Sequence, residues 1–105
     1  MIETPTKAAH NRSQERVSVA LPVHLETGGG GRTWNISASG VYFETDAELV
    51  QGSPINLEVE LNSPGGKLAL KVQGSVVRIE QLDGKIGVAV SIAESVLEPV
   101  PENAP

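Results

Sequence analysis

The chain of 105 residues contains no cysteine and only one tryptophan, one tyrosine and one phenylalanine. Without cysteine it can form neither a disulfide nor a thiolate metal site. No apolar run approaches the roughly 20 residues that a membrane-spanning helix needs, and residues 1–10 lack the apolar core of a signal peptide. We therefore expect a cytoplasmic protein that does not insert into a membrane.

Positive charge is also scarce, because eight Lys and Arg residues stand against thirteen Asp and Glu residues, which gives a net charge of −5. Binding to nucleic acid or to an anionic membrane surface requires a broad basic footprint. The composition therefore argues against both partners. An anionic ligand must instead be held locally, by a few cations that lie close together.

Catalytic and metal-binding patterns are missing as well. The two histidines, His10 and His24, show no His-x-x-x-His spacing, and no Gly-x-Ser-x-Gly elbow is present. The glycines at 28–31 are not followed by the Gly-Lys-Ser/Thr of a phosphate-binding loop. We expect no catalytic residues, no metal and no cofactor, and hence a protein that is not an enzyme.

Alternation of apolar and polar residues runs through most of the chain and indicates strands rather than helices. Pro22 places the first strand at an edge or a bulge, because proline cannot donate to a ladder. The alternation changes phase near Gly74, which predicts a bulge or a barrel corner, and Asp83-Gly84 is typical of a tight hairpin. The predicted strands span residues 17–25, 32–36, 41–44, 55–61, 68–79 and 86–92.

Six strands joined by short turns predict an antiparallel meander, and closure into a small barrel removes its exposed edges. The fold class that we predict is therefore all-β, a six-stranded antiparallel barrel. Ser91-x-x-Glu94 has the form of a capping box, which predicts a short C-terminal helix over 93–98. The expected organisation is a flexible segment at 1–10, one domain at 11–98 and a disordered tail at 99–105.

Two short motifs carry most of the functional information. Arg12 and Arg16 form an Arg-x-x-x-Arg pair just before the first predicted strand, and Asn35, Ser37 and Gly40 form an Asn-x-Ser-x-x-Gly pattern before the third. Either motif alone is most often an ordinary surface feature or turn. Their occurrence together, in this order and in this strand context, is far more specific than either half.

Together the two motifs resemble the signature of PilZ domains, small bacterial β-barrels that bind the second messenger cyclic di-GMP. The resemblance extends over roughly residues 11–92 and implies the same barrel. It implies that Arg12, Arg16, Asn35, Ser37 and Gly40 bind cyclic di-GMP. Single-domain members lack an output domain, so the resemblance also implies an effector protein as partner.

The chemistry of these side chains suits such a ligand. A guanidinium is always charged and offers a planar fork of donors to a phosphate or to the edge of guanine. The amide of Asn35 both donates and accepts. Gly40 permits a positive φ or a close approach of the ligand. The resemblance also implies that the residue before the first arginine influences the number of bound ligands, and Asn11 at this position leaves open whether one or two molecules bind.

Three interpretations remain open at the level of sequence. The first is a cyclic di-GMP receptor that changes conformation and signals to a protein. The second is a PilZ-fold interaction module that binds protein and no nucleotide. The third, a carbohydrate-binding or structural β domain, has few aromatic residues from which to build a platform. Trp34 is either a core residue or a ring at the ligand or partner surface.

Overall fold

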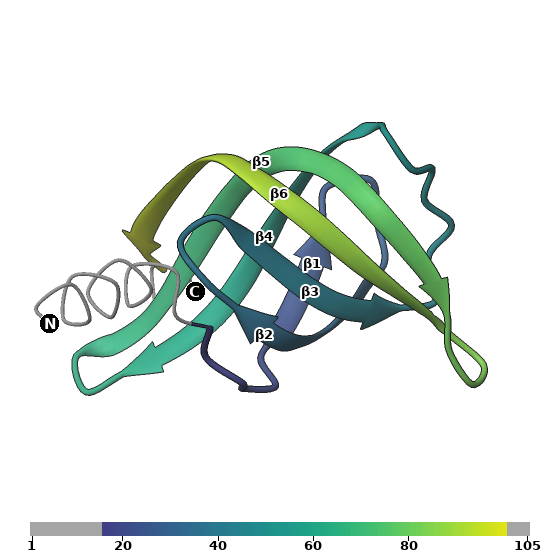
Figure 1. The fold of residues 1–105 in the computed structure, drawn as a ribbon. Helices are drawn as coiled ribbons and strands as arrows, with labels where there is room; N and C mark the ends of the chain where they lie inside the picture. The colour runs from purple at the N-terminus through teal and green to yellow at the C-terminus, as the bar shows by residue number, and fades with distance from the viewer. Residues whose placement is uncertain (1–15, 101–105) are drawn as a thin grey trace, which may run out of the picture.

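In the computed structural model, which describes residues 16–100, the chain forms six antiparallel strands. The strands are β1 (Pro22–Leu25), β2 (Gly30–Ile36), β3 (Gly40–Thr45), β4 (Pro54–Ser63), β5 (Gly66–Gln81) and β6 (Ile86–Pro99). They close into a barrel in the order β1-β2-β3-β6-β5-β4 (Figure 1). The predicted six-stranded antiparallel barrel is confirmed.

The expectation of a simple meander is wrong at one connection. Strands β1–β3 form one meander and β4–β6 form another, but β3 pairs with β6, and β4 pairs with β1. The connection between β3 and β4 runs over residues 46–53. Because this segment is longer than the two to five residues of a usual hairpin loop, it can cross to the other side of the barrel.

Strand β1 is shorter than predicted and begins at Pro22. The start of a strand is one of the few positions where proline loses no ladder bond. Before it, the chain still follows β2, because Val17 forms an isolated bridge with Ile36 and the Leu21 carbonyl accepts from Thr33 N at 2.9 Å. This path carries the first described residues along β2.

The predicted irregularity near Gly74 is confirmed, and a second one follows it. The register between β5 and β6 shifts between Gln73 and Gly74 and again between Val76 and Arg78. Val76 is therefore the buried residue, whereas Val77 is 51% exposed. Bulges of this kind let the long β5–β6 pair bend over the barrel, as Figure 1 shows.

The predicted C-terminal helix is wrong. Residues 93–98 continue β6, and residues 94–98 pair with β5 from Gln73 back to Ala69. A helix of six residues is marginal in water, whereas β5 offers a complete ladder to an added strand. Val100 N then donates to the Lys67 carbonyl at 3.0 Å. Pairing along β5 thus outweighs the local capping signal.

Inward-facing apolar side chains from all six strands fill the barrel, and Phe43, Val59, Val76 and Val88 are completely buried. The buried hydroxyls of Thr33 and Thr45 are satisfied by hydrogen bonds to neighbouring backbone groups. Within residues 16–100 no helix is long and apolar enough to cross a membrane. The candidate site therefore lies on the outside of a filled barrel.

Candidate functional site

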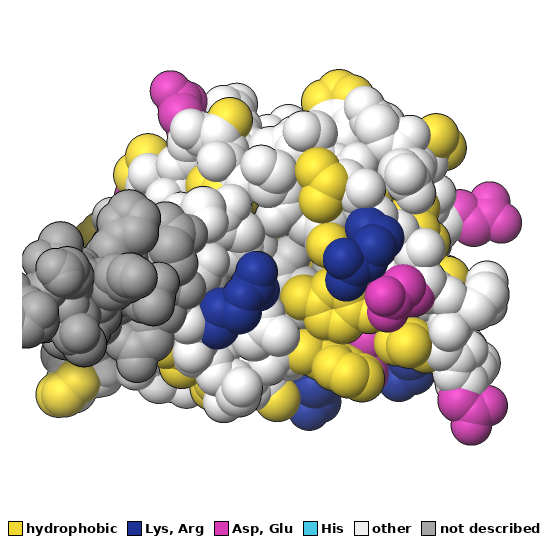
Figure 2. Space-filling view, in the orientation of Figure 1, with side chains coloured by type: hydrophobic (Ala, Val, Ile, Leu, Met, Phe, Trp, Pro, Cys, Tyr) yellow, Lys and Arg dark blue, Asp and Glu magenta, His cyan; other side chains and the backbone are white. Residues whose placement is uncertain are grey.

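Outward-facing residues of four strands meet at one hollow of about 530 Å³. The strand register places Asn35 of β2, Tyr42 of β3, Ala89 of β6 and Arg78 of β5 in one row across the sheet. Small residues line the hollow between the longer side chains. Among them are Gly40 of β3 and its register partner, Ser91 of β6. Lys and Arg side chains stand beside hydrophobic ones on the face shown in Figure 2.

The two sequence motifs meet at this hollow. Val17 N donates to the Ile36 carbonyl at 2.8 Å, and Ile36 N donates back to the Val17 carbonyl at 3.0 Å. This bridge holds Arg16 next to β2, where its Nη1 donates to Asn35 Oδ1 at 2.7 Å. Arg16, Asn35 and Gly40 all line the hollow. Arg12, the other predicted arginine, lies outside the described residues.

Trp34 shares the hollow with Asn35 because of a bulge. The register between β2 and β3 shifts between Thr33 and Asn35, which leaves Trp34 as the extra residue. Strict alternation would have pointed Trp34 away from Asn35, and that expectation is wrong. The core interpretation of Trp34 is also wrong, because this residue is 48% exposed and its Nε1 donates to Glu44 Oε1 at 2.8 Å.

Ser37 and Gly40 close the turn between β2 and β3. Ser37 N donates to the Gly40 carbonyl at 2.8 Å, and Ser37 Oγ accepts from Ser39 N at 3.3 Å. Ser37 is not among the residues that line the hollow. Its predicted contact with a ligand stays a prediction, and its observed role is to shape the turn that carries Gly40.

Of the two alternatives for Gly40, a positive φ or a close approach of the ligand, the positive φ is not adopted, since the described glycines with positive φ lie elsewhere. Gly40 instead lies close to β6, because a Cβ at this position would stand 3.1 Å from the Val90 carbonyl oxygen. Gly40 therefore allows close packing against β6 and keeps the adjoining part of the hollow open.

Three residues that the motifs did not indicate, Tyr42, Arg78 and Glu80, also line the hollow. Arg78 Nε lies 3.2 Å from Glu80 Oε2, and the hydroxyl of Tyr42 donates to Glu80 Oε1 at 2.7 Å. Burial raises the pKa of the Tyr42 hydroxyl, and its hydrogen bond to Glu80 raises this pKa further. The sequence did not indicate Arg78, because its position across from Ala89 depends on the two bulges in the β5–β6 pair.

The charges at the hollow favour an anion. Arg16 and Arg78 line it together with a single carboxylate, that of Glu80. At its edge, Glu44 Oε2 is paired with Lys85 Nζ at 3.0 Å. The hydrogen bond from Trp34, followed by the one from Lys85, lowers the pKa of Glu44. Arg78 is paired with Glu80, but two guanidiniums face this single carboxylate in the hollow, and guanidinium groups suit a phosphate.

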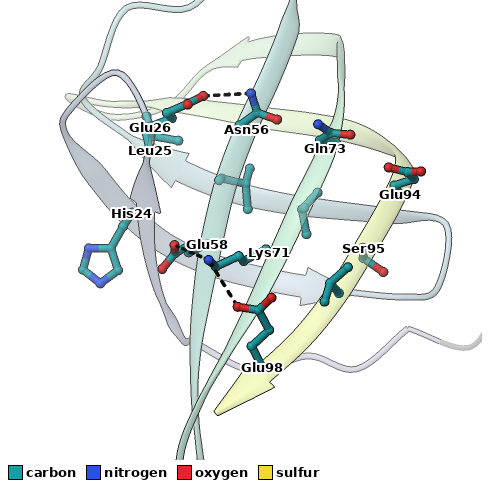
Figure 3. Close-up of a pocket in the computed structure, with 13 residues that line it drawn as sticks. His24, Leu25, Glu26, Asn56, Glu58, Lys71, Gln73, Glu94, Ser95 and Glu98 are labelled. Carbon is teal, nitrogen blue, oxygen red and sulfur yellow. Dashed lines mark hydrogen bonds and ion pairs between the residues drawn. The ribbon is translucent and has the colours of Figure 1, made fainter. Parts of the chain in front are cut away.

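A second hollow, of about 550 Å³, lies over β1, β4, β5 and β6 and has the opposite charge. Lys71 is its one lysine or arginine and is paired with Glu58 at 4.0 Å and Glu98 at 3.3 Å (Figure 3). Glu26, held by Asn56 at 2.8 Å, adds a further carboxylate, as does Glu94. Four carboxylates around one ammonium would repel phosphate, so this acidic groove does not suit an anionic ligand.

Comparison with known proteins agrees with the fold. The family model of the PilZ domain matches residues 10–98, and the chain therefore belongs to the PilZ family. Domains of this family are generally cyclic di-GMP receptors with regulatory roles, rather than enzymes.

Among solved structures, the Bacillus subtilis inhibitor of motility (MotI/DgrA) is similar, with a TM-score of 0.71 and 20% sequence identity. The match covers 81% of this chain and 44% of that protein, so this chain spans less than half the length of the Bacillus protein. At this identity the likeness concerns the fold alone. A search of curated proteins found no match.

Proposed function

We propose that this chain is a receptor for cyclic di-GMP that changes conformation on binding and signals to an effector protein in the bacterial cytoplasm. The observation that supports this proposal is the 2.7 Å contact between Arg16 Nη1 and Asn35 Oδ1 at the edge of the hollow. It joins the two motifs of the PilZ family in space, beside the open surface at Gly40.

The proposed mechanism begins with an exchange of partners. In the structure, Arg16 donates to the one acceptor atom of the Asn35 side chain. Cyclic di-GMP carries two phosphates and two guanines, and these offer Arg16 stronger acceptors than a neutral amide. When Arg16 turns to the ligand, Asn35 is released to bond the edge of a guanine.

The remaining residues then act around these two. Arg12 would approach the ligand from the same segment as Arg16, so residues 11–16 would fold over the bound nucleotide. This closure would change the surface around β2 and β3 that an effector protein meets. The family's regulatory character supports such a relay, and the partner would be a protein that recognises the closed surface.

Isothermal titration calorimetry with cyclic di-GMP tests the proposal, with GTP and cyclic di-AMP as control ligands. The wild-type protein should bind cyclic di-GMP and give no comparable heat with the controls. Arg12→Ala or Arg16→Ala removes a charged hydrogen-bonding group that contributes on the order of 1.5–3 kcal/mol. We expect a roughly ten- to hundredfold loss of affinity for each variant.

Arg32 provides a matched control, because it is an exposed arginine on β2 that does not line the hollow. Arg32→Ala removes the same charge and should leave the affinity nearly unchanged. Wild-type affinity in the Arg12→Ala/Arg16→Ala double variant would contradict the assignment of the site.

A second candidate function is that of a PilZ-fold module that binds protein and no nucleotide, and the end of β6 favours it. Pairing between β3 and β6 stops at Ser91, so β5 is the one described strand that pairs with residues 94–99. Val96 and Leu97 are 52% and 54% exposed there. An extended segment can add to such an edge, and the carboxylates of Glu94 and Glu98 favour a basic one.

The same calorimetric titrations separate the two functions. Binding of cyclic di-GMP with the expected dependence on Arg12 and Arg16 supports the receptor. The absence of heat from all three nucleotides, with a protein whose circular dichroism shows a folded barrel, favours the interaction module.

A further inference from the structure

Two aromatic rings border the hollow, and neither belongs to the two motifs. The rings of Trp34 and Tyr42 have centroids 5.6 Å apart and meet nearly at a right angle, with an interplanar angle of 82°. Edge-to-face contact of this kind is favourable for aromatic pairs. The pair forms a small aromatic surface directly beside Asn35 and Arg16.

Tyr42 is held in place by its whole surroundings. Its hydroxyl donates to Glu80 Oε1 at 2.7 Å. A Cβ on Gly87 would lie 2.0 Å from the Tyr42 hydroxyl oxygen and 2.8 Å from Cζ, which shows that the side chain extends across β6 over the bare backbone of Gly87. The Arg78 guanidinium carbon stands 5.9 Å from the ring centroid. Tyr42 is thus a fixed support.

Trp34 presents the open ring of the pair. Its single donor, Nε1, is already engaged by Glu44, and Lys85 holds the other oxygen of that carboxylate at 3.0 Å. Trp34 is nevertheless 48% exposed. With its polar atom satisfied, the surface that it offers to a ligand is aromatic. An aromatic ring held in advance loses little conformational entropy when it binds.

We propose that Trp34 is a base-stacking residue that receives a purine ring of the bound nucleotide, and that Tyr42 is the residue that positions it. This inference rests on the proposed function, because Arg16 and Asn35 must hold the same ligand. Stacking on an aromatic side chain tolerates any base but increases with the area of overlap. The two fused rings of a purine overlap an indole more fully than a pyrimidine does.

Calorimetry with cyclic di-GMP tests the stacking residue in Trp34→Ala and Trp34→Phe. We expect Trp34→Ala to lose about five- to hundredfold in affinity, the range found when a base-stacking aromatic residue is removed. Trp34→Phe should recover part of this loss, since it restores a ring without Nε1. Val77→Ala is the matched control, because Val77 is 51% exposed, lines the same hollow and carries no ring.

Acrylamide quenching of the wild-type protein gives an independent measurement, because Trp34 is the sole tryptophan. Saturation with cyclic di-GMP should shield the exposed indole and lower its quenching constant. If the wild type binds while Trp34→Ala keeps its affinity, or loses no more than Val77→Ala, the stacking subsite is overturned and the receptor function stands. If the wild type gives no heat, both are overturned.

Discussion

Glu44 connects the aromatic ring at the candidate site with a cation in the turn between β5 and β6. One carboxylate oxygen accepts from Trp34 Nε1 at 2.8 Å, and the other meets Lys85 Nζ at 3.0 Å. Both contacts favour the ionised form, and the hydrogen bond from Trp34 contributes most to the lowered pKa of Glu44. The charge of a residue outside the two motifs therefore orients a ring inside the hollow.

This arrangement predicts a pH-dependent signal from Trp34. Because the pKa of Glu44 is lower in the folded protein, its stabilising contacts are complete above the ordinary pKa of a glutamate. They are lost as the pH falls through the lowered value. Trp34 fluorescence should therefore change in acid with a midpoint below that of an ordinary glutamate, while circular dichroism still shows a folded barrel.

Glu44→Gln should abolish this transition, and Glu48→Gln, a change at an exposed carboxylate in the loop after β3, should preserve it. A fluorescence midpoint at or above the ordinary glutamate value would contradict the proposed pairing. So would an unchanged acid transition in Glu44→Gln.

At the scale of single residues, the resemblance to PilZ domains implied that Arg16, Asn35 and Gly40 share one site, and these three residues do line one hollow. It did not predict the position of Trp34. One extra residue in β2 reverses the face to which a side chain points, and no residue type in that strand marks the bulge. The sequence did not predict the position of Arg78 either, because that position depends on the bulges between β5 and β6.

At the scale of strands, Gly74 permits the bend of the β5–β6 pair. A Cβ at this position would lie 2.0 Å from the Ser91 carbonyl oxygen and 3.1 Å from Val90 Cγ1. Both neighbours belong to β6, and Ser91 is also the register partner of Gly40. The two strands therefore approach each other closely at Gly74, next to residues that line the candidate site.

Gly74→Ala should lower the free energy of unfolding by about 1–3 kcal/mol, the usual cost of forcing extra atoms into a packed position. Gly65→Ala is the matched control, because its Cβ would have no neighbour within 4 Å and its φ is not positive. Urea unfolding of both variants measures the difference. Equal stabilities would show that β5 and β6 separate at this point without cost.

The strands themselves were largely predictable, because alternation of apolar residues reports which face is buried. The hairpin at Asp83-Gly84 also formed as predicted, with Leu82 N donating to the Lys85 carbonyl at 2.9 Å. The predicted helix at 93–98 failed for a non-local reason. A capping pattern can be recognised from four residues of sequence. That β5 offers hydrogen-bonding partners to residues 94–98 can be recognised only once the pairing of the strands is known.

At the scale of the whole molecule, the barrel separates two hollows of unlike charge. The hollow at Arg16 and Arg78 faces outward from β2, β3, β6 and β5, while the acidic groove lies over β1, β4, β5 and β6. The net charge of −5 would by itself disfavour an anionic ligand. The local placement of the arginines outweighs this net charge at the hollow, because interactions between exposed charges are screened beyond about 10 Å in salt solution.

A residue-resolved NMR titration of the full chain with cyclic di-GMP tests the central claim, that the hollow joining the two motifs is the ligand site. We expect chemical shifts to change at the backbone amides of Arg16, Asn35 and Gly40 and at the indole N–H of Trp34. The chemical shifts of the backbone amides of Asn56, Gln73 and Glu94, in the acidic groove, should not change. Shifts confined to that groove, or a spectrum that does not respond to saturating ligand, would contradict the account.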